Sequence, residues 1–119
     1  MSSSPTSRTL KLIRDLGYSA EVTEKWIPGA YIRKDLFGFI DIIAIKLDEP
    51  DVGIQATSIS NMSARRLKIA ELADAVLWFD TKHRIWVVGW EKRKNRWVHR
   101  VDEMFMAGGE WLWHKVELK

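Results

Sequence analysis

The sequence predicts a single α/β domain in which helices flank a mixed central β-sheet. Its 119 residues, 46% of them hydrophobic, suffice for one compact core and are few for two. Runs of β-branched residues are interleaved along the chain with two segments of helical periodicity. No internal repeat or low-complexity linker divides the sequence. We therefore expect one domain over residues 1–119, with residues 1–6 as a frayed tail.

The first expected element is an amphipathic helix over residues 7–16. Its apolar residues recur at helical spacing, and Gly17 follows where a left-handed cap residue belongs. The loose alternation of residues 18–26 then indicates an edge-like strand. The turn pair Pro28-Gly29 ends that strand.

Two buried strands are expected next. Residues 38–46 are almost uniformly apolar and β-branched, as in a central strand that is covered on both faces. An acidic turn over residues 48–51 leads into a second buried strand over residues 52–58. Together these segments predict an antiparallel hairpin in the middle of the sheet.

The second helical segment has an apolar stripe at three- and four-residue intervals. We place one long helix at residues 62–80, capped by Asn61 or Ser63, and keep residues 75–79 as a separate strand in the alternative. Three more strands complete the sheet, namely the two arms of a hairpin and a final strand: 84–91, 96–101 and 110–118.

Composition narrows the classes of protein. There is no cysteine, and the start of the chain has neither a basic nor an apolar leader region. The longest apolar run, residues 39–45, is too short to span a bilayer. We therefore expect a soluble protein of the cytoplasm, or of the host cytoplasm if a phage encodes it. Five of the seven Trp residues lie in the last third, so the C-terminal segments should complete the core or form a protein interface.

Basic residues cluster near the ends of the expected elements, although the net charge is only +3. Such clusters contact phosphates in nucleic-acid-binding proteins, and a solvated helix face or turn explains each of them equally well. The clusters are Arg33-Lys34, Arg65-Arg66-Lys68 and Lys92-Arg93-Lys94-Asn95-Arg96.

One carboxylate, Asp41, interrupts the apolar strand, and it is the feature that most needs an explanation. A buried carboxylate is costly unless it is paired, hydrogen-bonded or bound to a metal. Gln55 and Thr57 are again polar side chains inside an apolar strand, on the other arm of the expected hairpin. We expect this hairpin to bring them to Asp41 only if its strands are staggered or bent.

At these residues the chain resembles the PD-(D/E)XK nuclease superfamily, and within it the small Holliday-junction-resolvase-like and phage-encoded endonucleases. The resemblance covers roughly residues 7–100 and implies a restriction-endonuclease-like fold. By position, Asp41 matches the metal-binding Asp, Gln55 the second acid, Ala56 a backbone carbonyl ligand and Thr57 the Lys that activates water. The implied cofactor is Mg²⁺ or Mn²⁺, which prefers oxygen ligands and can activate water for phosphodiester hydrolysis.

The sequence departs from the family pattern at two positions. Gln55 offers a neutral oxygen in place of a carboxylate, and Thr57 cannot supply an ammonium group. Asp35 could restore the second carboxylate from the loop before the Asp41 strand. The missing positive charge could come from one of four side chains on adjacent elements: Lys46, Arg65, Arg66 or Lys68.

Structural roles remain open for the same residues. Asp41 could be a buried carboxylate bonded to backbone donors or to Arg33, and Gln55 with Thr57 could be a satisfied polar pair in the sheet. Asp35 could be a loop or cap residue. The sequence contains no P-loop, dinucleotide fingerprint or Ser-His-Asp order, and His83, His99 and His114 lack metal-like spacing.

We therefore expect a metal-dependent DNA endonuclease that is selective for structures such as branched or single-stranded DNA. Cutting two strands symmetrically needs two sites, which predicts a homodimer. The expected metal ligands are Asp41, Asp35, Gln55 and Ala56, with Thr57 beside them, and the expected DNA contacts are Arg33, Lys34, Arg65, Arg66 and Lys68. The alternative is an inactive relative that binds DNA or protein, and a weaker one is a protein interface at the Trp-rich C-terminus.

Overall fold

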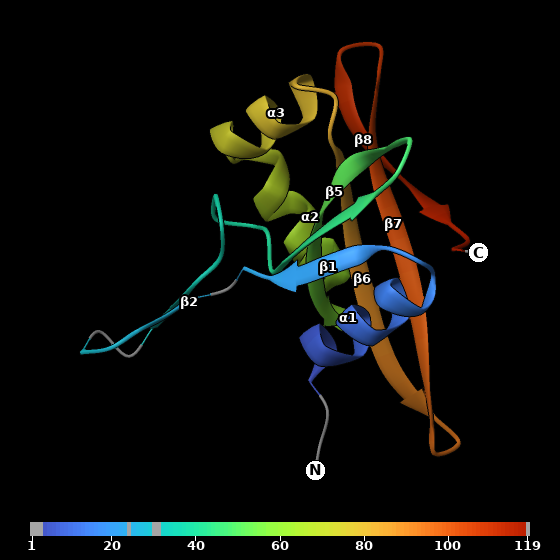
Figure 1. Ribbon diagram of the computed structural model, residues 1–119. Coiled ribbons are helices and arrows are strands. Elements are labelled where there is room, and N and C mark those ends of the chain that lie inside the picture. The colour runs from blue at the N-terminus through green and yellow to red at the C-terminus, as the bar shows by residue number, and fades with distance from the viewer. Residues whose placement is uncertain (1–3, 24, 30–31, 119) are drawn as a thin grey trace.

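The computed structural model describes residues 4–23, 25–29 and 32–118, except for the side chains of residues 25–27, 32 and 33. A six-stranded mixed sheet forms its centre, in the order β1-β4-β5-β6-β7-β8, with helices on both faces (Figure 1). A separate hairpin of β2 and β3 extends away from this body. The strands are β1 (Ser19–Val22), β2 (Lys25–Ile27), β3 (Ile32–Lys34), β4 (Ile42–Lys46), β5 (Glu49–Ser58), β6 (Arg84–Arg93), β7 (Arg96–Ala107) and β8 (Glu110–Val116).

The first helix, α1 (Pro5–Asp15), confirms the expected amphipathic helix and begins two residues earlier. Ser4 caps it, because the Ser4 and Ser7 side chains each accept a hydrogen bond from the other's backbone N–H. The expected frayed tail of residues 1–6 is therefore wrong for Ser4 to Thr6, and residues 1–3 lie outside the described part. Gly17 has a φ of +94°, as expected for the residue that ends the helix.

Two apolar clusters, one on each face of the sheet, form the core. On one face, α1 buries Ile13 against the sheet residues Ile42, Ile54 and Trp86. The opposite face is covered by α2 (Met62–Ala70) and α3 (Ala73–Asp80). Its cluster includes Phe39, Ile40, Met62, Ile69, Ala75, Ile85, Val87 and Met104.

The long helix expected at residues 62–80 is broken into α2 and α3, and the alternative of a strand at 75–79 is wrong. Leu72 has an extended conformation between the two helices and packs into the core, while Ala75 is fully buried. The break lets both helices turn an apolar side to the sheet, and that tertiary gain outweighs the continuous helical periodicity. Asn61 precedes α2 without making a side-chain capping bond.

The expected central strand over 38–46 is also shorter than the prediction. Residues 36–40 form a tight turn closed by a bridge between Leu36 and Ile40, and β4 begins only at Ile42. The strand expected at 18–26 is likewise divided, into β1 and β2. The expected acidic turn at 48–51 is confirmed only at Asp48, because the turn covers residues 47 and 48 and β5 already begins at Glu49.

The antiparallel pairing of β4 with β5 places Ile42 opposite Ile54 and Ala44 opposite Val52. A register shift occurs only between Ala44 and Lys46, near the turn. By contrast, β5 and β6 are parallel, and α2 and α3 lie between them in the chain. The sheet is therefore mixed, as the sequence predicts.

The strands β6, β7 and β8 form an antiparallel meander and confirm the three strands expected at the C-terminus. Trp86 and Trp90 are buried, so the Trp-rich segment does complete the core, while Trp97 is half-exposed. Gly89 permits the close approach of α2, because an added Cβ would lie 2.4 Å from Met62 Sδ. Among the described residues, no helix is long and apolar enough to cross a membrane.

Candidate functional site

The structure brings Asp35, Asp41 and Gln55 together at one wall of a polar cavity of about 550 Å³. This polar cavity lies on the α2 side of the sheet, since Gln55 pairs across the strands with Val87 of that face. Its remaining wall comes from the start of α1, the end of β5 and α2: Ser4, Pro5, Thr6, Ala56, Thr57, Ser58, Asn61, Arg65 and Lys68.

Asp41 stands immediately before β4, and its backbone is fixed from both sides. Its N–H donates to the Ile54 carbonyl at 2.8 Å, and its carbonyl accepts from the Thr23 N–H at 2.8 Å. The regular pairing of β4 with β5 ends at Ile42 and Ile54, and the side chain of Asp41 meets that of Gln55 just beyond it. Asp41 is a bend residue, and its N–H bonds to the carbonyl of Ile54 although Ile54 pairs with Ile42, so the chain is bent at this point as expected.

The Asp41 carboxylate, only 4% exposed, accepts two hydrogen bonds on one oxygen. The Gln55 Nε2 amide donates to Asp41 Oδ2 at 2.7 Å, and the Ala56 backbone N–H donates to the same oxygen at 2.9 Å. The Gln55 amide also lies 3.5 Å from Asp35 Oδ2. Among the described side chains, no Lys or Arg forms an ion pair with Asp41 or Asp35.

Burial raises the pKa of the Asp41 carboxyl to about 7. The neighbouring Asp35 contributes to the same rise through a hydrogen bond and its negative charge, because a proton shared by two carboxylates relieves their repulsion. The donors from Ala56 and Gln55 act in the opposite direction and favour the anion. Below this pKa Asp41 carries a proton, and above it the carboxylate beside Asp35 would be stabilised by a cation.

Gln55 contains the second unusual group of the site. It is 2% exposed, and its Oε1 atom is buried without a hydrogen-bond partner. A buried amide oxygen without a partner is destabilising by roughly 1–3 kcal/mol. A half-turn of the amide exchanges Oε1 and Nε2. The same side chain can therefore donate to the carboxylates or offer an oxygen ligand to a cation beside them.

These donors fit a hard divalent cation. Two carboxylates and one amide oxygen are the ligand types that Mg²⁺ and Mn²⁺ prefer. The described residues contain no group of three or more His, Cys, Asp or Glu side chains that could hold a metal, so Gln55 would have to complete the set. The contact seen at Ala56 involves its N–H, and its carbonyl as a ligand stays a prediction from the resemblance.

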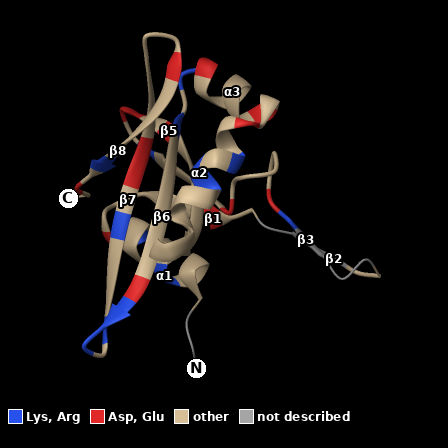
Figure 2. Ribbon diagram, turned by 180° about the vertical axis from the view of Figure 1, so that it is seen from behind, with Lys and Arg blue, Asp and Glu red and all other residues tan. Residues whose placement is uncertain are grey.

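Positive charge reaches the polar cavity from one face of α2. Arg65 and Lys68 both line it, as expected for residues three apart on a helix. Lys34 lines a neighbouring cavity, and the Arg33 side chain lies outside the described part. Figure 2 shows that α2 and the β6–β7 turn carry separate groups of basic residues.

Two of the proposed sources of positive charge point elsewhere. Arg66 donates to Asp102 Oδ2 at 2.6 Å on β7, and Lys46 donates to the Leu16 carbonyl at 3.0 Å beside the ring of Tyr18. Arg66 therefore lies apart from Arg65 and Lys68, and its expected contact with DNA stays a prediction.

Thr57 is buried and lines the polar cavity, two residues beyond Gln55 on the same face of β5. Its hydroxyl can hold a water molecule but carries no charge. Sequence reasoning missed Ser4 and Thr6, which reach the cavity from the start of α1. The combination of Ser4 with Pro5 was the available signal, since it is typical of a capped helix start.

Comparison with known proteins gives no relative. No protein-family model, no curated protein and no solved structure matches this chain. The proposals below therefore depend on the geometry and chemistry of the site.

Proposed function

We propose that this protein is a divalent-metal-dependent nuclease that hydrolyses DNA phosphodiester bonds, with a restriction-endonuclease-like fold of the PD-(D/E)XK type. The observation that carries the proposal is the meeting of Asp41, Asp35 and Gln55 in a cavity that Arg65 and Lys68 also line. Buried carboxylates without a cationic side chain are costly, and one benefit that can offset this cost is cation binding.

The topology supports the same proposal. Along the chain, α1 is followed by the strand that Asp41 precedes, then by β5 with Gln55-Ala56-Thr57, and then by the basic helix α2. This is the order that the resemblance implies. The antiparallel pairing of β4 with β5 explains how residues fourteen apart in sequence form one site.

Each residue can be given a role in the proposed reaction. Asp41, Asp35 and the Gln55 amide oxygen would hold the cation, while Arg65 and Lys68 would contact the phosphates of the bound strand. The Thr57 hydroxyl would orient a water molecule beside the ligands. A bound Mg²⁺ or Mn²⁺ supplies activation of that water and neutralises charge that develops on the phosphate.

A second candidate is a catalytically inactive relative that binds DNA or protein. Gln55 and Thr57 favour it, because they replace the acid and the Lys of the family motif and reduce the charge available to a metal. In that case no metal would bind, and the hydrogen bonds from Gln55 and Ala56 to Asp41 would have a structural role alone.

We further propose that the active form is a homodimer, since symmetric cleavage of two strands requires two sites. Light scattering of the free protein across a concentration series would test this. Dimeric mass at micromolar concentration is expected, whereas a monomer at every concentration would contradict it.

A cleavage panel tests the nuclease proposal. Single-stranded, duplex and branched DNA are incubated with wild type, Asp41→Asn and the control Asp48→Asn in Mg²⁺, Mn²⁺ or EDTA. Asp48 is an exposed turn residue with a φ of +65°, which Asn adopts readily, so the control removes a carboxylate without strain.

Wild type and Asp48→Asn are expected to cut at least one form with metal, and Asp41→Asn should be slower by at least about 100-fold. Equal cutting by Asp41→Asn would reject the site. Absence of cutting of every DNA form would leave the inactive binding module as the function.

A further inference from the structure

Phe37 is held in an unfavourable backbone conformation with a half-exposed side chain. Its φ is +55°, in the left-handed region that bulky residues avoid at a cost of about 1–2 kcal/mol. The turn around it is fixed by hydrogen bonds from the Gly38 and Ile40 N–H groups to the carbonyls of Asp35 and Leu36. The side chain is nevertheless 49% exposed, so the fold keeps an aromatic ring outside its core.

Phe37 stands between two cavities. One, of about 550 Å³, is lined by Thr23, Lys34, Asp35, Leu36, Phe37, Gly38 and Asp74. The other, of about 300 Å³, is lined mainly by apolar and aromatic side chains, and we call it the aromatic groove: Phe37, Asp74, Leu77, Trp78, Thr81 and His83.

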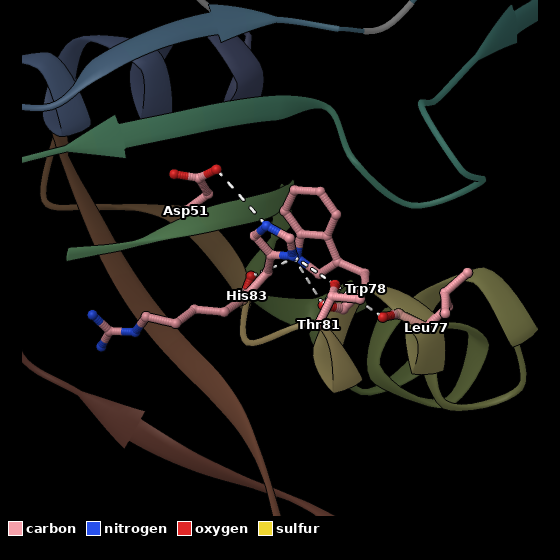
Figure 3. Close-up of polar contacts among 6 residues, drawn as sticks. Asp51, Leu77, Trp78, Thr81 and His83 are labelled. Atoms are coloured by element: carbon pink, nitrogen blue, oxygen red, sulfur yellow. Dashed lines mark hydrogen bonds and ion pairs between the residues drawn. The ribbon is translucent and has the colours of Figure 1, made fainter.

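The inner wall of the aromatic groove is held by ring stacking and hydrogen bonds. Trp78 and His83 stack with ring centroids 4.2 Å apart, and Trp78 Nε1 donates to the Arg84 carbonyl at 2.9 Å. His83 Nδ1 lies 2.8 Å from the Thr81 hydroxyl, and His83 Nε2 lies 3.8 Å from Asp51, as Figure 3 shows. The Phe37 ring lies 6.4 Å from that of Trp78, at the outer edge of this wall.

The groove is close to the candidate metal site. Asp35 lines both the polar cavity and the cavity beside Phe37. Two residues of chain span at most about 7 Å, so the Cα atoms of Asp35 and Phe37 are no further apart than that. Stacked nucleotides advance about 3.4 Å each along a strand, so the Phe37 ring lies within a few nucleotides of a phosphate at Asp35.

We propose that Phe37 and the aromatic groove bind an unpaired base of a single-stranded nucleic acid whose phosphate lies in the polar cavity. This inference rests on the proposed function and specifies its substrate class. Lys34 lines the cavity beside Phe37, between the aromatic groove and Asp35. Arg65 and Lys68 provide positive charge for phosphates in the polar cavity.

The lining of the groove favours a base over a phosphate. None of its described lining side chains is a Lys or Arg, and the Asp74 carboxylate repels phosphate while it can accept a hydrogen bond from an amino group of a base. Stacking of bases on aromatic rings is a general means of binding single strands. A duplex would offer the ring no free base face, because each base is covered by its neighbours.

Binding measurements without cleavage test this inference. Fluorescence anisotropy follows a labelled single-stranded DNA, and a strand of equal length with every base removed, at low ionic strength in EDTA. Phe37→Asn removes the ring and suits the left-handed backbone, so it should fold at least as well as wild type. Phe37→Tyr retains a ring, and Leu47→Asn removes another exposed apolar side chain, 89% exposed at the far β4–β5 turn.

We expect Phe37→Asn to bind the normal strand roughly tenfold more weakly, and Phe37→Tyr and Leu47→Asn to bind it like wild type. The difference between wild type and Phe37→Asn should vanish on the base-free strand, since no base remains to stack. Equal binding by Phe37→Asn, an equal loss on the base-free strand, or no binding by wild type would overturn the inference. Failure of the nuclease proposal is seen separately, as absent cleavage in Mg²⁺ and Mn²⁺.

Discussion

Among the described residues two aspartates are buried, and their surroundings are opposite. Asp102 on β7 is 1% exposed and Asp41 before β4 is 4% exposed. Asp102 is bonded to two guanidinium groups, with Arg66 at 2.6 Å and Arg100 at 2.9 Å. Asp41 is bonded to an amide and a backbone N–H, and that amide also lies 3.5 Å from a second carboxyl, Asp35 Oδ2.

The difference teaches that burial of a charge does not by itself identify a functional site. Asp102 forms ion pairs with two arginines, and their positive charge offsets the cost of burying its carboxylate. No described Lys or Arg side chain pairs with Asp41, and Asp41 lines an open cavity. A buried acid that is left incomplete and accessible is a candidate for binding a cation.

Asp41→Asn should stabilise the metal-free protein at pH 8 by on the order of 2–4 kcal/mol. Asn resembles the protonated acid, since its oxygen can still accept from Gln55 and Ala56 while its NH₂ group can donate to Asp35. Urea unfolding in EDTA measures the free energy of unfolding of both proteins. Lower stability of Asp41→Asn at pH 8 would contradict the incomplete environment of Asp41.

The same pair of proteins has a predicted pH dependence. The pKa of Asp41 rises from 3.8 in the unfolded chain to about 7 in the folded state. Below pH 3.8 Asp41 is protonated in both the folded and the unfolded state, so it does not reduce the free energy of unfolding. Between these values the unfolded chain ionises first, so wild-type stability falls as pH rises and the loss is complete above pH 7. The advantage of Asp41→Asn should therefore disappear near pH 4, and an advantage that is independent of pH would refute this cause.

Arg66→Met should destabilise the protein by about 2 kcal/mol, because buried Asp102 then retains only Arg100. Met preserves much of the apolar stem of the side chain. The control Lys11→Met breaks the exposed pair with Asp15 and should change stability by less than about 0.5 kcal/mol. Equal effects of the two substitutions in urea unfolding would show that Asp102 does not depend on its cations.

Gln55→Glu should have the smallest effect. It should lower the stability of the metal-free protein and raise the affinity for the metal. A third carboxylate beside Asp41 and Asp35 destabilises the metal-free protein through repulsion, and it should tighten Mn²⁺ binding by about tenfold through one more anionic ligand. Cleavage by this variant should equal or exceed that of wild type. Calorimetric Mn²⁺ titration compares the affinities, and weaker binding by Gln55→Glu would place the cation elsewhere.

The sequence predicts the candidate site better than it predicts the elements around it. Asp41 and Gln55 stand out because each is a polar residue in an apolar run, and a single hairpin suffices to bring them together. Asp35 adjoins them because it is only six residues from Asp41 across a tight turn. Such local signals identify the site residues even where the predicted ends of the strands are wrong.

Other features depend on packing that no local pattern shows. Arg65 and Arg66 are adjacent in sequence, yet the helix turns one to the polar cavity and the other to Asp102, and their order gives no indication of which is which. The break at Leu72 has no Gly or Pro to announce it. The exposed ring of Phe37 is visible only once the turn before Asp41 is known.

The most direct test of the central claim is a calorimetric titration of wild type and Asp41→Asn with Mn²⁺ at pH 6, 7 and 8, in buffers of different ionisation enthalpy. Wild type should bind Mn²⁺ with an affinity that rises from pH 6 to pH 8, and it should release protons at pH 6, because the cation displaces the proton of Asp41. Asp41→Asn should bind far more weakly and without this proton release. No Mn²⁺ binding by wild type, or equal binding by Asp41→Asn, would contradict the account.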